Sequence, residues 1–159
     1  MTEPLSIRLA HPEEAGVLSE LAFRSKAHWG YSQSFLDSCR AELAVDPERI
    51  GSADYQCFVA ANRKYVIGFY AVEKVSKRVY ELEALFVEPK YIGTGVGRTL
   101  IQHAISLVSK YGAERLIIQG DPNARRFYLT AGAHQIGTRE SGSVPGRFLP
   151  LFQVDIGDH

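Results

Sequence analysis

The sequence predicts an α/β (α+β) fold, with a mixed, mostly antiparallel central sheet of about six to seven strands flanked by about four helices. Three runs of strand character follow one another between residues 55 and 87, and consecutive short strands form an antiparallel meander. A glycine-rich segment, 93–97, then opens a long amphipathic pattern that leads to a short apolar run at 115–119. A helix between two strands returns the chain to a parallel neighbour, so the sheet is expected to be mixed.

Local signals assign the elements in order. Apolar residues at helical or alternating spacing separate helices from strands, while proline, glycine and asparagine mark where they start and stop. In chain order we expect a strand at 6–9, a helix that starts at 11–14 and ends near Gly30, a helix at 32–43, strands at 56–60, 65–72 and 79–87, a helix from the glycine segment to 111–112, a strand at 115–119, a helix capped by Asn123 that ends at Gly132, and strands at 134–138 and 148–155.

Length and charge limit the function classes. The 159 residues suit a single domain, residues 1–159, with no repeat or linker. Eighteen basic and eighteen acidic side chains cancel, which argues against a nucleic-acid or membrane-surface protein held by bulk charge. The N-terminus lacks the charged and apolar regions of a leader, and no apolar run could span a membrane. We therefore expect a soluble, cytoplasmic protein.

Cysteine and histidine residues give no sign of a disulfide or a metal site. Cys39 and Cys57 are far apart and form no CxxC pair, so two reduced thiols are expected. The histidines show no ligand spacing with one another or with the cysteines. No metal is predicted.

The strongest chemical signal is the segment 85–98, in which a strand stops at Pro89 and a glycine-dense turn opens a helix. N–H groups at a helix N-terminus lack partners and carry partial positive charge, and glycines let an anion approach the backbone. A phosphate or pyrophosphate is therefore expected there, the alternative being an ordinary flexible turn. The spacing Gly-x-Gly-x-Gly, with no Gly-Lys-Ser/Thr, matches neither a dinucleotide fingerprint nor a P-loop.

Two segments resemble the GNAT superfamily of N-acetyltransferases. The first is 85–98, with Leu-Phe-Val before the turn and Gly-Thr-Gly-Val-Gly-Arg within it, and the second is 121–133, a helix bearing Phe-Tyr and followed by Gly132. Their order and spacing, and the order of the expected elements, match the superfamily over almost the whole chain. The resemblance implies a GNAT-like fold and acetyl-CoA as cosubstrate, contacted by Leu85, Phe86, Val87, Gly93, Thr94, Gly95, Val96, Gly97, Arg98 and Asn123.

Three residues depart from the superfamily's pattern. Ile92 stands where an Arg or Gln usually helps to hold the pyrophosphate, which leaves the backbone N–H groups as the cradle. Asp121 replaces the usual Asn and Asn123 lies two residues later, so which of them contacts the cofactor stays open. Ala133 replaces an aromatic residue, with no chemical consequence expected.

The resemblance implies that the backbone of 85–87 holds the pantetheine arm and the thioester carbonyl, as an oxyanion hole does. An ordinary amine is protonated at neutral pH, so the reaction needs a proton acceptor. Glu83 and Glu81 are the candidates, and strand alternation places both on one face with Glu83 nearer the thioester. The alternative is a pair of solvated carboxylates.

Tyr128 stands where the superfamily supplies a proton to the departing CoA thiolate, and a phenol can donate one. Helical spacing after Asn123 directs Ala124, Phe127 and Ala131 to the core and leaves Tyr128 at the boundary of that face. The alternative is a tyrosine that only packs.

Two further segments point to the acceptor side. Residues 26–31 place a Lys, a His, the only Trp and a Tyr after the first helix, in a loop of the kind that often carries binding residues. Aromatic packing is the alternative there. Arg147, in the loop 141–147, is placed to meet a carboxylate or the cofactor's phosphates, or to stay solvated. Cys57 falls in the hairpin, which disfavours a covalent acyl-enzyme.

The sequence thus predicts an N-acetyltransferase that moves acetyl from acetyl-CoA to a primary amine by direct attack in a ternary complex. A GNAT-like acyl-CoA sensor with weak or no catalysis is the runner-up, kept open by Ile92 and Asp121. A structural domain without cofactor is a third reading. The expected partner is a small-molecule or peptide amine, with no nucleic acid and no membrane. The resemblance also leaves a homodimer open, because dimers are common in the superfamily.

Overall fold

The computed structural model describes residues 4–157 and contains a seven-stranded sheet with the strand order β1-β2-β3-β4-β5-β7-β6. All neighbouring strands run antiparallel except β4 and β5, which are parallel. The elements are β1 (Ser6–Leu9), α1 (Ala15–Ala27), α2 (Gln33–Leu43), β2 (Tyr55–Ala61), β3 (Val66–Ser76), β4 (Val79–Val87), α3 (Val96–Lys110), β5 (Arg115–Gln119), α4 (Arg125–Thr130), β6 (His134–Glu140) and β7 (Phe148–Asp155), with 3-10 turns at Pro12–Glu14, Pro89–Tyr91 and Pro122–Ala124.

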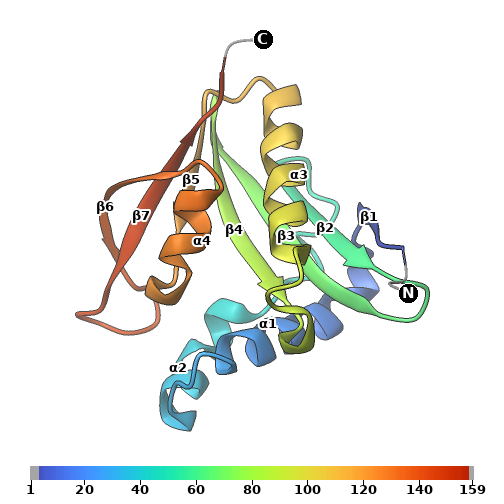
Figure 1. Cartoon of the computed structure of the whole chain (residues 1–159), viewed down its shortest axis with the longest axis vertical. Helices are drawn as coiled ribbons and strands as arrows, with labels where there is room; N and C mark the ends of the chain where they lie inside the picture. The colour runs from blue at the N-terminus through green and yellow to red at the C-terminus, as the bar shows by residue number, and fades with distance from the viewer. Residues whose placement is uncertain (1–3, 158–159) are drawn as a thin grey trace.

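Helices cover both faces of the sheet (Figure 1). Leu18 and Leu21 of α1 pack on one face, and Leu100 and Ile101 of α3 pack on the other. β3 lies between the two cores, because its side chains alternate. Phe69 and Ala71 belong to the α1 core, while Tyr70 and Val72 belong to the α3 core.

The predicted fold class is confirmed, and the strands at 79–87, 115–119 and 148–155 have the predicted bounds. The first helix differs, because residues 12–14 form a 3-10 turn and α1 begins only at Ala15. The Glu14 carboxylate accepts the N–H of His11 at 2.8 Å and closes that turn.

The predicted cap at Asn123 is wrong. Asp121 is the N-cap, since its carboxylate accepts the N–H of Asn123 at 2.9 Å. A 3-10 turn, Pro122–Ala124, follows, and α4 starts only at Arg125. Aspartate caps as well as asparagine does, so sequence preference alone could not choose between the two residues.

The strands β4 and β5 separate along their length. They pair only from Val79 with Arg115 to Leu82 with Ile118. Beyond that point β4 continues to Val87 as a partner of β3 alone, while β5 keeps its pairing with β7 as far as Gln119. Figure 1 shows the two strands together at one end and apart toward α1 and α2. The sheet therefore opens at its centre.

Gly120 follows β5 directly at this opening and is packed on two aromatic rings. A Cβ atom there would lie 2.9 Å from the Phe152 ring and 3.0 Å from the Tyr128 ring, both buried. We expect Gly120→Ala to lower the free energy of unfolding by about 1–3 kcal/mol, the usual cost of overpacking. Gly16→Ala is the control, because its Cβ meets nothing within 4 Å, and it should be neutral or stabilising by up to about 1 kcal/mol. Equal urea midpoints for the two variants would contradict the tight contact.

Candidate active site

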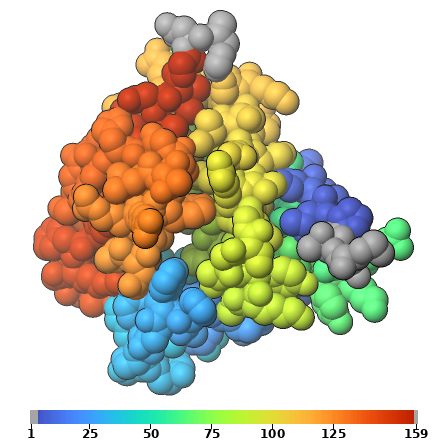
Figure 2. Space-filling model, viewed as in Figure 1, coloured from blue at the N-terminus to red at the C-terminus, as the bar shows by residue number. Residues whose placement is uncertain are grey.

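A cavity of about 570 Å³ lies where β4 and β5 separate, a volume within the usual range for small-molecule sites. Figure 2 shows a hollow where the light-blue α2, the orange region of α4 and the yellow-green turn before α3 meet. Most of the residues predicted for the site line the cavity, namely Glu81, Glu83, Leu85, Phe86, Val87, Gly93, Gly95, Gly97, Arg98, Asn123 and Tyr128. Thr94 and Val96 do not.

The backbone of the glycine turn is left-handed at two positions. Gly93 and Gly95 have φ of 84° and 96°, the left-handed region that side chains with a Cβ disfavour. Gly95 is the N-cap residue of α3. Neither glycine N–H is hydrogen-bonded to another residue within 4–157, and the first N–H groups of α3 have no partner within the helix. These N–H groups form a cradle suited to an anion.

Three residues of the same segment stabilise the turn or the packing around it. The Thr94 hydroxyl donates to the carbonyl of Tyr91 at 2.5 Å and so stabilises the turn itself. Val96 is buried in the core. A Cβ at Gly97 would lie 3.2 Å from the Phe127 ring, so a glycine lets α3 and α4 approach one another. A contact of Val96 with a ligand would therefore use its backbone, since its side chain is buried.

The free part of β4 supplies a backbone edge to the cavity. Leu85, Phe86 and Val87 pair with β3 on one side and have no partner on β5. In an extended strand the N–H and C=O groups alternate between its two edges. The edge that faces the opening can therefore hydrogen-bond an extended ligand.

A β-bulge sits at Glu83. Ala84 pairs with Ala71 and Leu82 pairs with Val72, so Glu83 is an extra residue without a partner on β3. Tyr80 and Leu82 pack in the α3 core before the bulge, whereas Leu85 and Val87 do so after it. Strand alternation is therefore interrupted at Glu83. Glu81 and Glu83 both line the cavity, but the bulge, and not the alternation assumed from the sequence, sets the direction of Glu83.

The two glutamates differ in electrostatics. Glu81 is held by Arg139 of β6, whose Nη1 lies 2.5 Å from its carboxylate. Glu83 forms no ion pair with a described residue, and its side chain is open to the cavity. Desolvation by the surrounding protein, followed by the nearby carboxylate of Glu81, raises the pKa of Glu83 to about 7. Glu83 can therefore exchange a proton near neutral pH.

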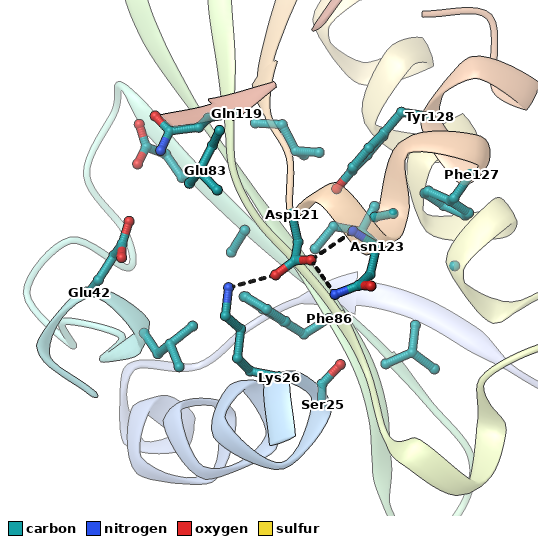
Figure 3. Close-up of a pocket in the computed structure, with 18 of the residues that line it drawn as sticks. Ser25, Lys26, Glu42, Glu83, Phe86, Gln119, Asp121, Asn123, Phe127 and Tyr128 are labelled. Carbon is teal, nitrogen blue, oxygen red and sulfur yellow. Dashed lines mark hydrogen bonds and ion pairs between the residues drawn. The ribbon is translucent and has the colours of Figure 1, made fainter. Parts of the chain in front are cut away.

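Tyr128 is more buried than the helical spacing predicted. It is the buried residue of α4, 7% exposed, while Phe127 is only partly buried. Its ring contacts Phe152 with the centroids 5.6 Å apart. In Figure 3 the hydroxyl end points toward Asp121 and Asn123. Burial, followed by the Asp121 charge, raises the pKa of Tyr128, so the phenol keeps its proton at neutral pH.

Asp121 is the centre of a polar cluster that joins distant parts of the chain (Figure 3). Its carboxylate accepts from Lys26 Nζ at 2.8 Å, from the Tyr31 hydroxyl at 2.8 Å and from Asn123 Nδ2 at 2.9 Å. The Tyr31 hydroxyl in turn accepts from Arg147 Nη2 at 3.0 Å. Burial alone would raise the pKa of Asp121, but the hydrogen bonds from Lys26 and Asn123 outweigh it and lower the pKa. Asp121 is therefore a structural anion at neutral pH.

The sequence pattern did not predict this cluster. It marked the loop 26–31 and Arg147 separately, without a reason to bring them together. The structure also places Arg139 at the site. No sequence pattern indicated this residue, because its partner Glu81 is 58 positions away.

A second, shallower hollow lies between α3 and α4. It has a volume of about 350 Å³ and includes Arg98, Gln102 and Arg126. Arg98 also lines the main cavity, so the two hollows adjoin. Two guanidinium groups give this groove a positive character that suits an anionic group.

Three other features concern residues 4–157. No helix there has both the length and the apolar character needed to cross a bilayer. No group of three or more His, Cys, Asp or Glu side chains in that range could hold a metal ion. Cys39 and Cys57 are both free and buried.

Comparisons with known proteins point to one family. The family model described as an acetyltransferase (GNAT) domain matches residues 17–142. Proteins described as uncharacterized N-acetyltransferases from Mycobacterium bovis and Mycobacterium tuberculosis are 30% identical over 108 residues. That alignment covers 65% of this chain and 65% of each relative's length.

Solved structures show the same fold. The PaiA N-acetyltransferase from Thermoplasma acidophilum, in complex with coenzyme A, has a TM-score of 0.79 at 21% identity and covers 96% of this chain and 99% of its own. A putative acetyltransferase from Salmonella typhimurium, solved with its cofactor acetyl-CoA, has a TM-score of 0.72 at 18% identity, covering 98% and 96%.

Proposed function

Because the chain belongs to the GNAT acetyltransferase family, we propose that it moves the acetyl group of acetyl-CoA to a primary amine by direct attack in a ternary complex. The observation that carries this proposal is the cavity itself. It brings the anion-binding turn, the free edge of β4, Glu83 and Tyr128 to one place. A thioester and an amine bound there would meet beside a proton acceptor and a proton donor.

The residues present fit acetyl-CoA. The pyrophosphate would accept hydrogen bonds from the N–H groups of the glycine turn and the start of α3. This backbone cradle can act without the Arg or Gln that Ile92 replaces. The amides of the pantetheine arm would pair with the free edge at 85–87, and an N–H of that edge would stabilise the oxyanion of the thioester carbonyl. Arg98 and Arg126 supply charge for a further phosphate of the cofactor. Two solved structures of this fold contain coenzyme A or acetyl-CoA.

Glu83 is the proposed proton acceptor. A carboxylate with a pKa of about 7 is partly ionised at neutral pH and is basic enough to take a proton from an ammonium, directly or through a water molecule. Glu81 suits this role less, because Arg139 occupies its carboxylate. The freed amine nitrogen attacks the thioester carbonyl carbon, so that a C–N bond forms and the C–S bond breaks.

Tyr128 is the proposed proton donor to the departing thiolate. Its phenol stays protonated at neutral pH and its hydroxyl end points into the cavity. CoA would then leave as the thiol, and the second proton that the attacking nitrogen loses on becoming an amide would replace the one that Tyr128 gave up. Asn123 Nδ2 is bonded to Asp121 and Tyr31, so the side chain of Asn123 holds the cluster together and only its remaining surface could touch the cofactor.

The first test is the pH dependence of acetyl transfer. With a panel of amines, CoA release should be detected, and kcat/KM should show a bend near pH 7 as Glu83 loses its proton. Glu83→Gln should remove the bend and lower the rate by about 10²–10⁴-fold. Glu81→Gln, the matched control, should keep the bend but move it to lower pH, because the Glu81 charge that helps to raise the pKa of Glu83 is then removed.

Two outcomes would contradict this assignment. If Glu81→Gln removes the bend and Glu83→Gln keeps it, the two roles are reversed. If acetyl-CoA binds but no amine in the panel releases CoA, the chain is an acyl-CoA sensor and not a transferase.

The second test addresses the glycine turn. Gly95→Val places a branched side chain at a φ of 96°, at the N-cap where the pyrophosphate would lie. We expect CoA affinity, measured by calorimetry, to fall at least about tenfold, or 1.4 kcal/mol. Gly112→Val is the control, because Gly112 has a φ of 82° just beyond the other end of α3. It carries similar backbone strain but should leave the affinity unchanged. A similar loss in both variants would mean that strain, not the anion cradle, was measured.

The third test separates catalysis from packing at Tyr128. Tyr128→Phe keeps the ring contacts with Phe152 and removes only the hydroxyl, for which no hydrogen bond is found within residues 4–157. Its melting temperature should barely change, while kcat should fall by about 10²–10⁴-fold. A kcat within about threefold of wild type would exclude the proton-donor role, since general-acid catalysis is worth more than that.

A further inference from the structure

The two acceptor-side segments of the sequence meet in the structure. The loop after α1 contributes Tyr31, and the β6–β7 loop contributes Arg147, 116 residues later. Arg147 packs against the rings of Tyr31 and Phe35. It therefore lies on the acceptor side of the cavity, away from the helix N-terminus proposed for the pyrophosphate.

The Arg147 guanidinium is held by two aromatic rings and one hydrogen bond, which leaves most of its N–H groups free to bind a ligand. It stacks on Phe35, with 4.7 Å from Cζ to the ring centroid, and on Tyr31 at 5.4 Å. Nη2 donates to the Tyr31 hydroxyl at 3.0 Å, and no other hydrogen bond of this side chain is found within residues 4–157. The side chain is 21% exposed and lines the cavity. A guanidinium fixed by stacking, with an edge left free, matches the geometry of a carboxylate.

The charges around Asp121 do not balance. Lys26 and Arg147 both lie near this one carboxylate, at 2.8 Å and 3.9 Å. All three side chains are largely buried, with exposures of 13%, 21% and 14%. One positive charge is left over in a partly desolvated place, where it has a cost that a bound anion would remove.

We propose that the amine acceptor also carries a carboxylate, which binds Arg147 while its amine reaches Glu83. The acceptor class is thus an amino carboxylate, of which a free amino acid is the simplest example. This inference rests on the proposed function and adds the substrate class to it. The carboxylate would also offset the spare positive charge beside Asp121.

A second class of acceptor, one that carries an additional positive charge, would fit another residue of the same cavity. Glu42 of α2 lines the cavity and accepts a hydrogen bond from the Ser143 hydroxyl, with no cation within 4 Å among residues 4–157. Glu42 and Glu83 together would suit an acceptor with two cationic nitrogens. Glu42 is exposed and not held by stacking, whereas Arg147 is half-enclosed and oriented, so the observations favour the carboxylate.

The test compares matched pairs of acceptors. Each α-, β- or γ-amino acid is assayed beside its own carboxamide, with linear diamines added, and CoA release is followed. The wild-type protein should prefer the best amino acid over its carboxamide by at least about tenfold in kcat/KM, the value of one charge-assisted contact. In Arg147→Gln this ratio should fall toward one, because KM rises more for the acid than for its carboxamide.

Two further variants complete the design. Arg147→Lys retains the charge but not the planar fork, and should restore only part of the preference. Arg63→Gln changes the net charge equally in the exposed hairpin turn and should leave the ratio as in wild type.

The outcomes separate this inference from the proposed function. Equal rates for acids and carboxamides in the wild-type protein, or a diamine preferred over every amino acid, would overturn the inference and leave the transferase standing. An equal loss for both acceptors in Arg147→Gln would also overturn it, because Arg147 would then only hold the loop. If no amine of any kind releases CoA, the proposed function fails and this inference fails with it.

Discussion

The separation of β4 from β5 beyond Leu82 is the constraint on which the rest of the site depends. A parallel pair that stayed together would satisfy the backbone of 85–87 and close the sheet. Here β5 keeps its pairing with β7 instead, and the unpaired edge of β4 faces a cavity. Unpaired backbone groups inside a protein are costly unless water or a ligand meets them. The opening therefore lowers the stability of the sheet, and it leaves an unpaired edge where an extended ligand can bind.

The bulge at Glu83 is the second consequence of the same opening. It lies one residue beyond the last pair between β4 and β5, where the strand has lost one of its two neighbours. The extra residue reverses the alternation, so that Leu85 and Val87 still face the α3 core. It also leaves Glu83 beside Glu81 in a cavity that withholds water from its charge. The raised pKa of Glu83 thus follows from this placement, through desolvation first and the neighbouring Glu81 carboxylate second.

The sequence predicted the parts of this protein that are set by local pattern. β4 and β5 were located to the residue, and the glycine turn was found, because alternation, turn residues and motif spacing act over short distances. The bulge could not be predicted, since Glu81-Leu82-Glu83 reads as an unbroken alternation. The cap at Asp121 was missed because aspartate and asparagine cap equally well, and the contact of Asp121 with Lys26 could not be predicted because the two residues are 95 positions apart. Contacts of that kind are decided by the folded chain alone.

The Asp121 cluster shows how such distant contacts determine the acceptor side. One carboxylate at the start of the α4 segment holds Lys26 from α1 and Tyr31 from the following loop, and Tyr31 holds Arg147 from the β6–β7 loop. The loop after α1 and the β6–β7 loop are thereby tied to the segment that carries Tyr128. Because Asp121 keeps its charge well below neutral pH, this arrangement persists while Glu83 changes its protonation state. Asp121 and Glu83 therefore change protonation in separate pH ranges, so that under the proposed function the cluster would keep its arrangement while Glu83 takes up a proton.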